Sequence, residues 1–371
     1  MTASRQFWKS AAIIAAATIG SGVFALPYVV ARAGWLVAIF YFIAFTIVVS
    51  AAHAIYLKTL ESVGEKERLL GLARKYFGAV GFWIGFVAIV VGLLLSFTAY
   101  LILGPQFLRL LFPALAPGAA LALFWLVIAA PVFLREKSAV KLAELGILLV
   151  FFVIIVVFFA GHPLQAFLNF PSVNMRFIFL PLGVILFSLA GWTGIESVYD
   201  TTKGGIKNSR SMWIALAAGT AFAALLSFLF AMGILGSASQ VTEDTLSGLM
   251  NLPYWEKGLI AAIGLFAVWT ASVPLSRELR NALEKDLRWN HLLARLMIVG
   301  LPLVAVSIGF NNFLVVVGLA GGLFLSTQYL LILSVGWRAL VFSRMQKIFL
   351  GIVASMFIFA AVYSIYGFIV K

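Results

Sequence analysis

The stretch TIGSGVFALPY, residues 18–28, places two glycines and a proline in the middle of an apolar run. The run carries no charged side chain from residue 10 to residue 31, and a helix of about 20 such residues crosses the hydrocarbon core of a bilayer. In hydrocarbon every backbone N–H and C=O needs a partner, so a membrane helix is interrupted only where it lines a cavity or is buried in protein. Gly20, Ser21 and Gly22 therefore predict a break at a functional site.

A second stretch, FLPLGVILFSLAGWTGIESVYD (179–200), repeats this pattern in the middle of the chain. Gly191 and Gly194 interrupt it at similar depth, and Pro181 stands before the break as Pro27 stands after the first one. One glycine pair alone is typical of close helix packing. Two pairs in corresponding helices favour a transporter binding site at the midplane of the membrane.

The composition supports a membrane protein. Of the 371 residues 63% are apolar and 11% are charged, whereas about 25% are charged in soluble domains. Cysteine is absent and the three histidines are scattered, so we expect no disulfide, no metal centre and no cofactor.

Charged residues divide the chain into apolar stretches of membrane-spanning length. Stretch 296–337 is long enough for two helices, and SIGFNN (307–312) supplies a turn within it. The prediction is therefore an all-α protein with eleven transmembrane helices. The charge-free stretches are 10–31, 33–57, 76–108, 110–134, 145–175, 177–195, 211–242, 258–276, 296–337 and 348–370.

Eleven spans that alternate in direction place successive loops, and their basic residues, on opposite faces of the membrane. One face collects 21 of the 26 Lys and Arg residues and the other holds 5. The positive-inside rule then places the N-terminus in the cytoplasm and the C-terminus outside, in the cell membrane. The net charge of +13 thus reflects topology, and no nucleic-acid partner is expected.

The two broken helices stand first in two groups of five. We predict one transporter domain (1–371) with a first repeat over 9–160 (helices 1–5) and an inverted second repeat over 177–336 (helices 6–10). Helix 11 follows over 345–370. Spans 1–5 and 6–10 start from opposite sides because an odd number of crossings separates them.

The breaks suggest how both ends of an amino acid are bound. Free N–H groups after Gly20 suit a carboxylate, and carbonyls released near Ile19 and at Ser188–Ala190 accept hydrogen bonds from an ammonium group or coordinate a cation. Gly92 and Ser96 in helix 3 leave room for a substrate side chain, as Gly318, Gly321 and Gly322 do in helix 10. The predicted substrate-binding residues are Thr18, Ile19, Gly20, Ser21, Gly22, Val23, Ser188, Ala190, Gly191, Trp192, Thr193, Gly194, Gly92 and Ser96.

Three motifs resemble the amino acid/polyamine/organocation superfamily, and within it the amino acid/auxin permease and tryptophan/tyrosine permease branch. They are TIGSGVFALPY (18–28), SLAGWTGIESV (188–198) and TASVPLSRELRNALEKDL (270–287). The resemblance implies secondary amino acid transport on a LeuT-type fold, with five-plus-five inverted repeats and broken helices 1 and 6.

The sequence departs from these relatives in its coupling residues. Sodium-coupled relatives carry an Asn where this chain has Ala16, which puts sodium coupling in doubt. The lysine of some proton-coupled relatives is missing too, because residues 145–160 carry no charge.

Glu196, about one turn past the second break, is the leading proton carrier, since ionisable groups within a span are functional by default. A paired or solvated carboxylate is the alternative. His53 is expected to be a packed neutral histidine. A sodium ion would instead use the Ile19 carbonyl with Thr270 and Ser272, although such hydroxyls usually bond their own helix.

Two other classes remain as alternatives to a symporter of neutral or aromatic amino acids. An intramembrane serine hydrolase would use Ser21 with His53 as base, but nothing acidic is placed to orient the histidine. An ion channel would need a filter-like carbonyl loop, and none is evident. Primary pumping is disfavoured because no GxxxxGK[ST] sequence occurs.

Overall fold

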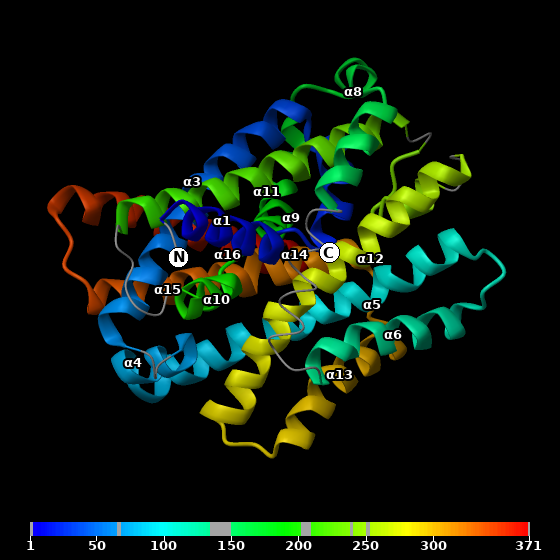
Figure 1. Cartoon of the computed structure of the whole chain (residues 1–371). Helices are drawn as coiled ribbons and strands as arrows, with labels where there is room; N and C mark the ends of the chain where they lie inside the picture. The colour runs from blue at the N-terminus through cyan, green and yellow to red at the C-terminus, as the bar shows by residue number, and fades with distance from the viewer. Residues whose placement is uncertain are drawn as a thin grey trace.

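The computed structural model describes residues 3–64, 68–133, 150–201, 209–237, 240–249 and 253–369, and in these ranges all regular structure is helical. The long helices pack side by side in one bundle (Figure 1). The α-helices are α1 (Ala3–Thr18), α2 (Leu26–Ala33), α3 (Trp35–Val63), α4 (Leu69–Phe86), α5 (Gly92–Leu111), α6 (Pro117–Phe133), α8 (Pro163–Asn169), α9 (Pro181–Ser188), α10 (Thr193–Thr201), α11 (Ser209–Ser237), α12 (Tyr254–Arg280), α13 (His291–Ser307), α14 (Phe313–Leu319), α15 (Ser326–Ala339) and α16 (Arg344–Ile369). A further helix covers Val150–Ala160. The tighter and wider helical segments are η1 (Ser21–Ala25), η2 (Val87–Val91), η3 (Met175–Phe177), η4 (Leu246–Leu249), η5 (Asn281–Asp286) and η6 (Ala320–Leu325).

Within the described ranges, seven helices or runs of consecutive helices are long and apolar enough to cross a membrane, and nine are if each of two bent pairs is one span. Two shorter apolar helices, α6 and α13, lie in two further predicted stretches. Stretch 296–337 is divided between α13 and α14 at the predicted turn. The chain is a multi-pass membrane protein, while the total of eleven spans stays a prediction.

The breaks in the first and sixth helices are confirmed. Helix α1 ends at Thr18, η1 begins at Ser21, and the two halves are bent by 52°. Helix α9 ends at Ser188 and α10 begins at Thr193. The first interruption contains Gly20 and the second contains Gly191, while Gly22 and Gly194 lie in the helical segments that follow them.

A kink divides α4. At Gly78 the backbone has φ 61° and ψ −145°, a conformation that favours glycine because it has no Cβ. The part of α4 after this kink continues through η2 into α5 as the third span.

The connections lie at two opposite ends of the bundle. Figure 1 shows the α3–α4 and α15–α16 connections at one end, and the α5–α6 turn and α8 at the other. We call the first of these the α3–α4 end. Between the ends, α1 packs against α11, α10 and α12, and α9 packs against η6. The two breaks therefore lie inside the bundle, where Ile19 is 0% and Trp192 is 1% exposed.

Candidate functional site

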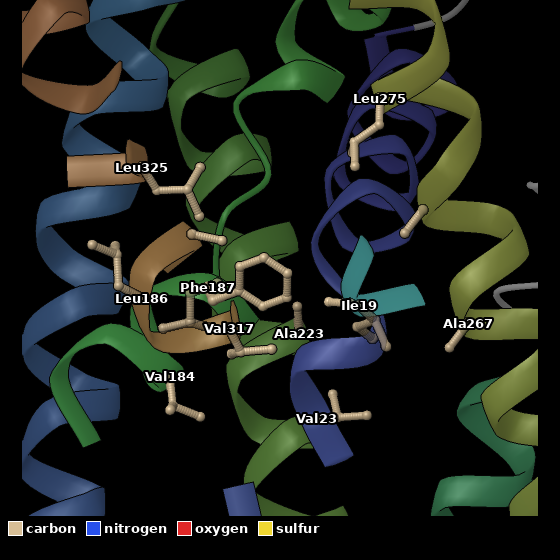
Figure 2. Close-up of a cluster of buried hydrophobic side chains, with 14 of the residues drawn as sticks. Ile19, Val23, Val184, Leu186, Phe187, Ala223, Ala267, Leu275, Val317 and Leu325 are labelled. Carbon is tan, nitrogen blue, oxygen red and sulfur yellow. The ribbon is translucent and has the colours of Figure 1, made fainter. Parts of the chain in front are cut away.

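The two broken helices touch at their glycines. A Cβ at Gly22 would lie 2.7 Å from the Ser188 hydroxyl and 2.7 Å from Cδ1 of Phe187. A Cβ at Gly194 would lie 2.8 Å from the Ala17 methyl group. Figure 2 shows the Phe187 ring reaching from the sixth helix toward Ile19 at the first break. These glycines thus let the two breaks approach each other closely.

A small cavity lies where the breaks meet. Its volume is about 30 Å³, room for about two water molecules, so the site is closed in this conformation. Five spans contribute to its wall. The lining residues are Ala17, Thr18, Gly20, Gly22, Leu93, Ser96, Tyr100, Phe187, Ala190, Trp192, Thr193, Leu275 and Leu325.

The cavity brings together half of the residues predicted to bind substrate. Thr18, Gly20, Gly22, Ser96, Ala190, Trp192 and Thr193 line it. The other predicted residues, Ile19, Ser21, Val23, Ser188, Gly191, Gly194 and Gly92, lie outside its lining. Their part in binding stays a prediction.

The sequence predicts that several glycines leave room for a substrate. In this conformation, most of them pack against other helices instead. A Cβ at Gly92 would lie 2.7 Å from Nε2 of Gln328. Gly321 packs against the Gly183 carbonyl, and Gly322 packs against Ser364. Gly318 has open space beside it but lines a different cavity, between α9, α14 and α16.

Two buried hydroxyl groups at the breaks have no hydrogen-bond partner among the described residues: those of Ser21 and Thr193. Thr193 also lines the cavity. In contrast, the hydroxyls of Thr18 and Ser188 donate to their own helices, to Ile14 at 2.7 Å and Val184 at 2.9 Å. The Thr193 hydroxyl is therefore available to form a hydrogen bond in the cavity.

Adjacent residues of α15 hold the second break in place. The Trp192 indole donates to Oε1 of Gln328 at 2.6 Å, and Nε2 of Gln328 donates to the Ala88 carbonyl at 2.7 Å. The Tyr329 hydroxyl lies close to the backbone of Gly191 and Trp192. Helix α15 thus contacts both the backbone and the indole at the break.

His53 orients the Tyr329 hydroxyl. The Thr220 hydroxyl donates to the Leu216 carbonyl at 3.0 Å, so it accepts from Nδ1–H of His53, 3.3 Å away. The Nε2 atom of the neutral ring then accepts from the Tyr329 O–H at 3.1 Å. His53 is packed in the interior, as predicted, and its two ring nitrogens bond Thr220 and Tyr329 rather than Ser21.

Glu196 belongs to a buried ion-pair cluster on the α3–α4 side of the break. Its Oε1 accepts from the Tyr56 hydroxyl at 2.8 Å, and its Oε2 lies 3.3 Å from Nε of Arg68. Arg68 also pairs with Asp200 at 3.3 Å, and Arg277 of α12 pairs with the same carboxylate. The cluster joins the start of α4 to α10 and α12.

Arg68 lies outside the spans. Burial lowers its pKa, but Glu196 and Asp200 outweigh burial and raise the pKa above its ordinary value. Arg68 therefore stays charged. Glu278 on α12 is 2% exposed and close enough to interact electrostatically with Glu196 and Arg68.

The residues predicted for a sodium site flank the first break. Ala271 lies beside Gly20, where an added Cβ would come within 3.2 Å of its methyl group. On either side of it, the Thr270 hydroxyl donates to Ala267 at 3.0 Å and the Ser272 hydroxyl donates to Trp269 at 2.7 Å. Both hydroxyls thus bond their own helix.

Sequence reasoning missed several of these residues. Arg68, Gln328, Tyr329 and Glu278 were not predicted, although Glu278 stands in the motif quoted for helix 8. The available signal for Glu278 was its position, a charged residue two places after the apolar stretch ends.

Solved structures of similar shape identify the fold. A mutant of the manganese transporter of Eremococcus coleocola matches with a TM-score of 0.63 at 13% identity, over 97% of this chain and 86% of that one. Mhp1, a nucleobase-cation-symport-1 family transporter in a closed conformation with bromovinylhydantoin bound, matches with a TM-score of 0.59 at 12% identity, over 96% and 90%. These likenesses show the fold alone, and it is the LeuT-type transporter fold.

The family follows from the sequence. The model of the tryptophan/tyrosine permease family matches residues 3–251, and the chain belongs to this family. No curated protein sequence matches the chain. The protein is a secondary transporter and not an enzyme.

Proposed function

We propose that this permease carries a neutral or aromatic amino acid across the cell membrane in symport with a proton, by alternating access around the cavity at the two breaks. The observation that carries the proposal is the polar chemistry of that cavity. The start of η1 at Gly20 and Gly22 and the unpartnered Thr193 hydroxyl line the same small space. A helix start and a free hydroxyl are suited to a carboxylate.

The backbone of each break has a separate role in this proposal. The N–H groups from Gly20 to Val23 bind the substrate carboxylate, because the first N–H groups of a helix have no partner within it. The carbonyls of Ser188–Ala190, at the end of α9, accept from the substrate ammonium group.

The wall of the cavity supports an aromatic substrate. Tyr100, Phe187 and Trp192 all line it, and aromatic rings stack on one another in offset or edge-to-face arrangements. The family's own name points to the same substrates. Because the cavity now holds about 30 Å³, Phe187 or Tyr100 has to move before any amino acid can enter.

Proton coupling is favoured over sodium coupling for two reasons. Glu196 is a buried carboxylate beside the break, held by Arg68 and Tyr56, and its protonation would weaken the contact that closes the α3–α4 end. The Thr270 and Ser272 hydroxyls bond their own helix. Glu278 is the second candidate carrier because it is buried close to Glu196.

The proposal includes the predicted arrangement in the membrane. Residues 9–160 and 177–336 form the two inverted repeats, and helix 11 follows over 345–370. The N-terminus is cytoplasmic and the C-terminus is external, so the α3–α4 end faces the cytoplasm.

Uptake into liposomes tests the substrate. All twenty amino acids are offered to the purified protein under an inward proton gradient. We expect accumulation of tryptophan, tyrosine or another neutral amino acid against its gradient. Uptake of none of the twenty would contradict the amino acid assignment.

The same liposomes test the coupling. An inward proton gradient without sodium is expected to drive accumulation, and Glu196→Gln is expected to abolish it while substrate exchange persists, because exchange moves no net proton. If Glu196→Gln accumulates normally and Glu278→Gln does not, the second carboxylate is the carrier. Strict dependence on sodium, lost in Thr270→Ala or Ser272→Ala, would reject proton coupling.

A further inference from the structure

A cavity larger than the one at the breaks lies between α4, the end of α15 and the start of α16. Its volume is about 320 Å³, within the range of small-molecule binding pockets. Leu333 and Leu350 form a buried part of its wall, while Trp337 is 47% exposed at its opening. It shares no lining residue with the cavity at the breaks.

Two basic side chains line this cavity. The Arg338 guanidinium carbon lies 6.0 Å from the centre of the Phe77 ring, and Nζ of Lys347 lies 5.6 Å from the centre of the Trp337 ring. All four residues line the cavity. Contact with an aromatic face holds a cation in place without neutralising its charge.

The charge at this cavity is not balanced by its own helices. None of α4, α15 and α16 carries an aspartate or glutamate, and no acidic residue follows Asp286 in the sequence. The cavity therefore combines an apolar wall with two cations. Basic residues are expected at this end of the bundle because the predicted orientation places it in the cytoplasm. That orientation does not explain why an apolar cavity lies beside them.

We infer that this cavity binds an anionic phospholipid, with an acyl chain along Leu333 and Leu350 and the headgroup phosphate at Arg338 and Lys347. The apolar wall matches the chain, and the two cations match the negative phosphate. An exposed tryptophan such as Trp337 is typical of the membrane–water interface, where a headgroup lies. The site does not depend on which substrate the permease carries.

Lipid titration of the purified full-length protein in detergent tests the inference, with bound lipid counted by native mass spectrometry. Phosphatidylglycerol is expected to bind more tightly than phosphatidylcholine with the same acyl chains. The double variant Arg338→Gln/Lys347→Gln should weaken phosphatidylglycerol binding about thirtyfold, or about fivefold for each charge. Arg5→Gln removes one exposed charge elsewhere and should leave the affinity unchanged.

A second pair of variants tests the acyl-chain site without changing charge. Gly351 lines the cavity, and a Cβ added there meets no atom within 4 Å. Gly351→Leu should therefore extend a side chain into the cavity and weaken the binding of both lipids. Gly367 on the same helix also has open space, but it lines the cavity near α9, so Gly367→Leu should bind as the unchanged protein does.

Three results with the lipids themselves would overturn the inference. They are equal affinity for the two lipids, equal loss in Arg5→Gln and in the double variant, and normal lipid binding by folded Gly351→Leu. Glycerol 3-phosphate supplies the same phosphate without chains and should not compete. Competition by it at the concentrations at which the lipid binds would show a phosphate site and reject the lipid.

Discussion

The Thr193 hydroxyl can be tested for contact with the substrate by replacing that one group. Its hydroxyl is buried, lines the cavity and has no partner among the described residues. We expect Thr193→Val to raise the apparent KM for uptake about tenfold, the loss of one hydrogen bond of about 1 kcal/mol or slightly more, without lowering the amount of folded protein. Thr193→Ser keeps the hydroxyl and is the matched control. Uptake by Thr193→Val with an unchanged KM would show that the hydroxyl does not touch the substrate.

Tyr329 and His53 make a second residue-scale prediction, about support of the break rather than contact with substrate. Tyr329→Phe removes the hydroxyl that donates to His53 beside the break, and leaving a buried polar group unpaired costs about 1–3 kcal/mol. His53→Leu leaves the Tyr329 hydroxyl without its acceptor. Because both changes act on one hydrogen-bond chain, the double variant is expected to lower the unfolding temperature by less than the sum of the single losses. Additive losses would mean that His53 does not act through Tyr329.

At the scale of the elements, the ion-pair cluster predicts how one end of the bundle is kept closed. Arg68 bridges Glu196 and Asp200 of α10, so Arg68→Gln should free α10 from the start of α4. The chain has no cysteine, and Ala17→Cys places a single thiol in the cavity wall. We expect Arg68→Gln to increase labelling of this thiol by a membrane-impermeant reagent several-fold.

The control for this prediction is Arg74→Gln. Arg74 also lies on α4, but it is exposed and stacks over Phe82 rather than joining the cluster. Equal labelling in the Arg68→Gln and Arg74→Gln backgrounds would show that the cluster does not close this end.

The elements also show how far the sequence alone could predict the site. The breaks at Gly20–Gly22 and Gly191–Gly194 were predictable because glycine and proline act locally, through the backbone hydrogen bonds of a single helix. The cluster around Glu196 was not, because Tyr56 and Glu196 are 140 residues apart and nothing local pairs them. For the same reason the sequence predicts room for a substrate at Gly92, whereas in the structure Gly92 lies against Gln328 of α15.

At the scale of the whole molecule, the fold and the charge distribution predict the orientation together. The α3–α4 and α15–α16 connections share one end (Figure 1), as the alternation of spans requires. When successive spans alternate in direction, both connections belong to the face that carries 21 basic residues. The opposite face carries 5. If the chain had one span more or fewer, every connection after the extra or missing span would be assigned to the opposite face. The basic residues of those connections would then no longer gather on the cytoplasmic face.

The final prediction is therefore that a tag placed after Lys371 is accessible from outside in intact cells, and that a tag before Met1 is accessible only after permeabilisation. The positive-inside rule sets the orientation of the first spans, and eleven crossings put the two termini on opposite sides. The measurement is antibody binding to each tagged protein before and after permeabilisation, with transport activity confirming that each is folded. A single cysteine introduced at Ser172, between α8 and η3, is the internal control and should be labelled from outside. Equal access of the two tags would leave an even number of spans and would contradict the prediction.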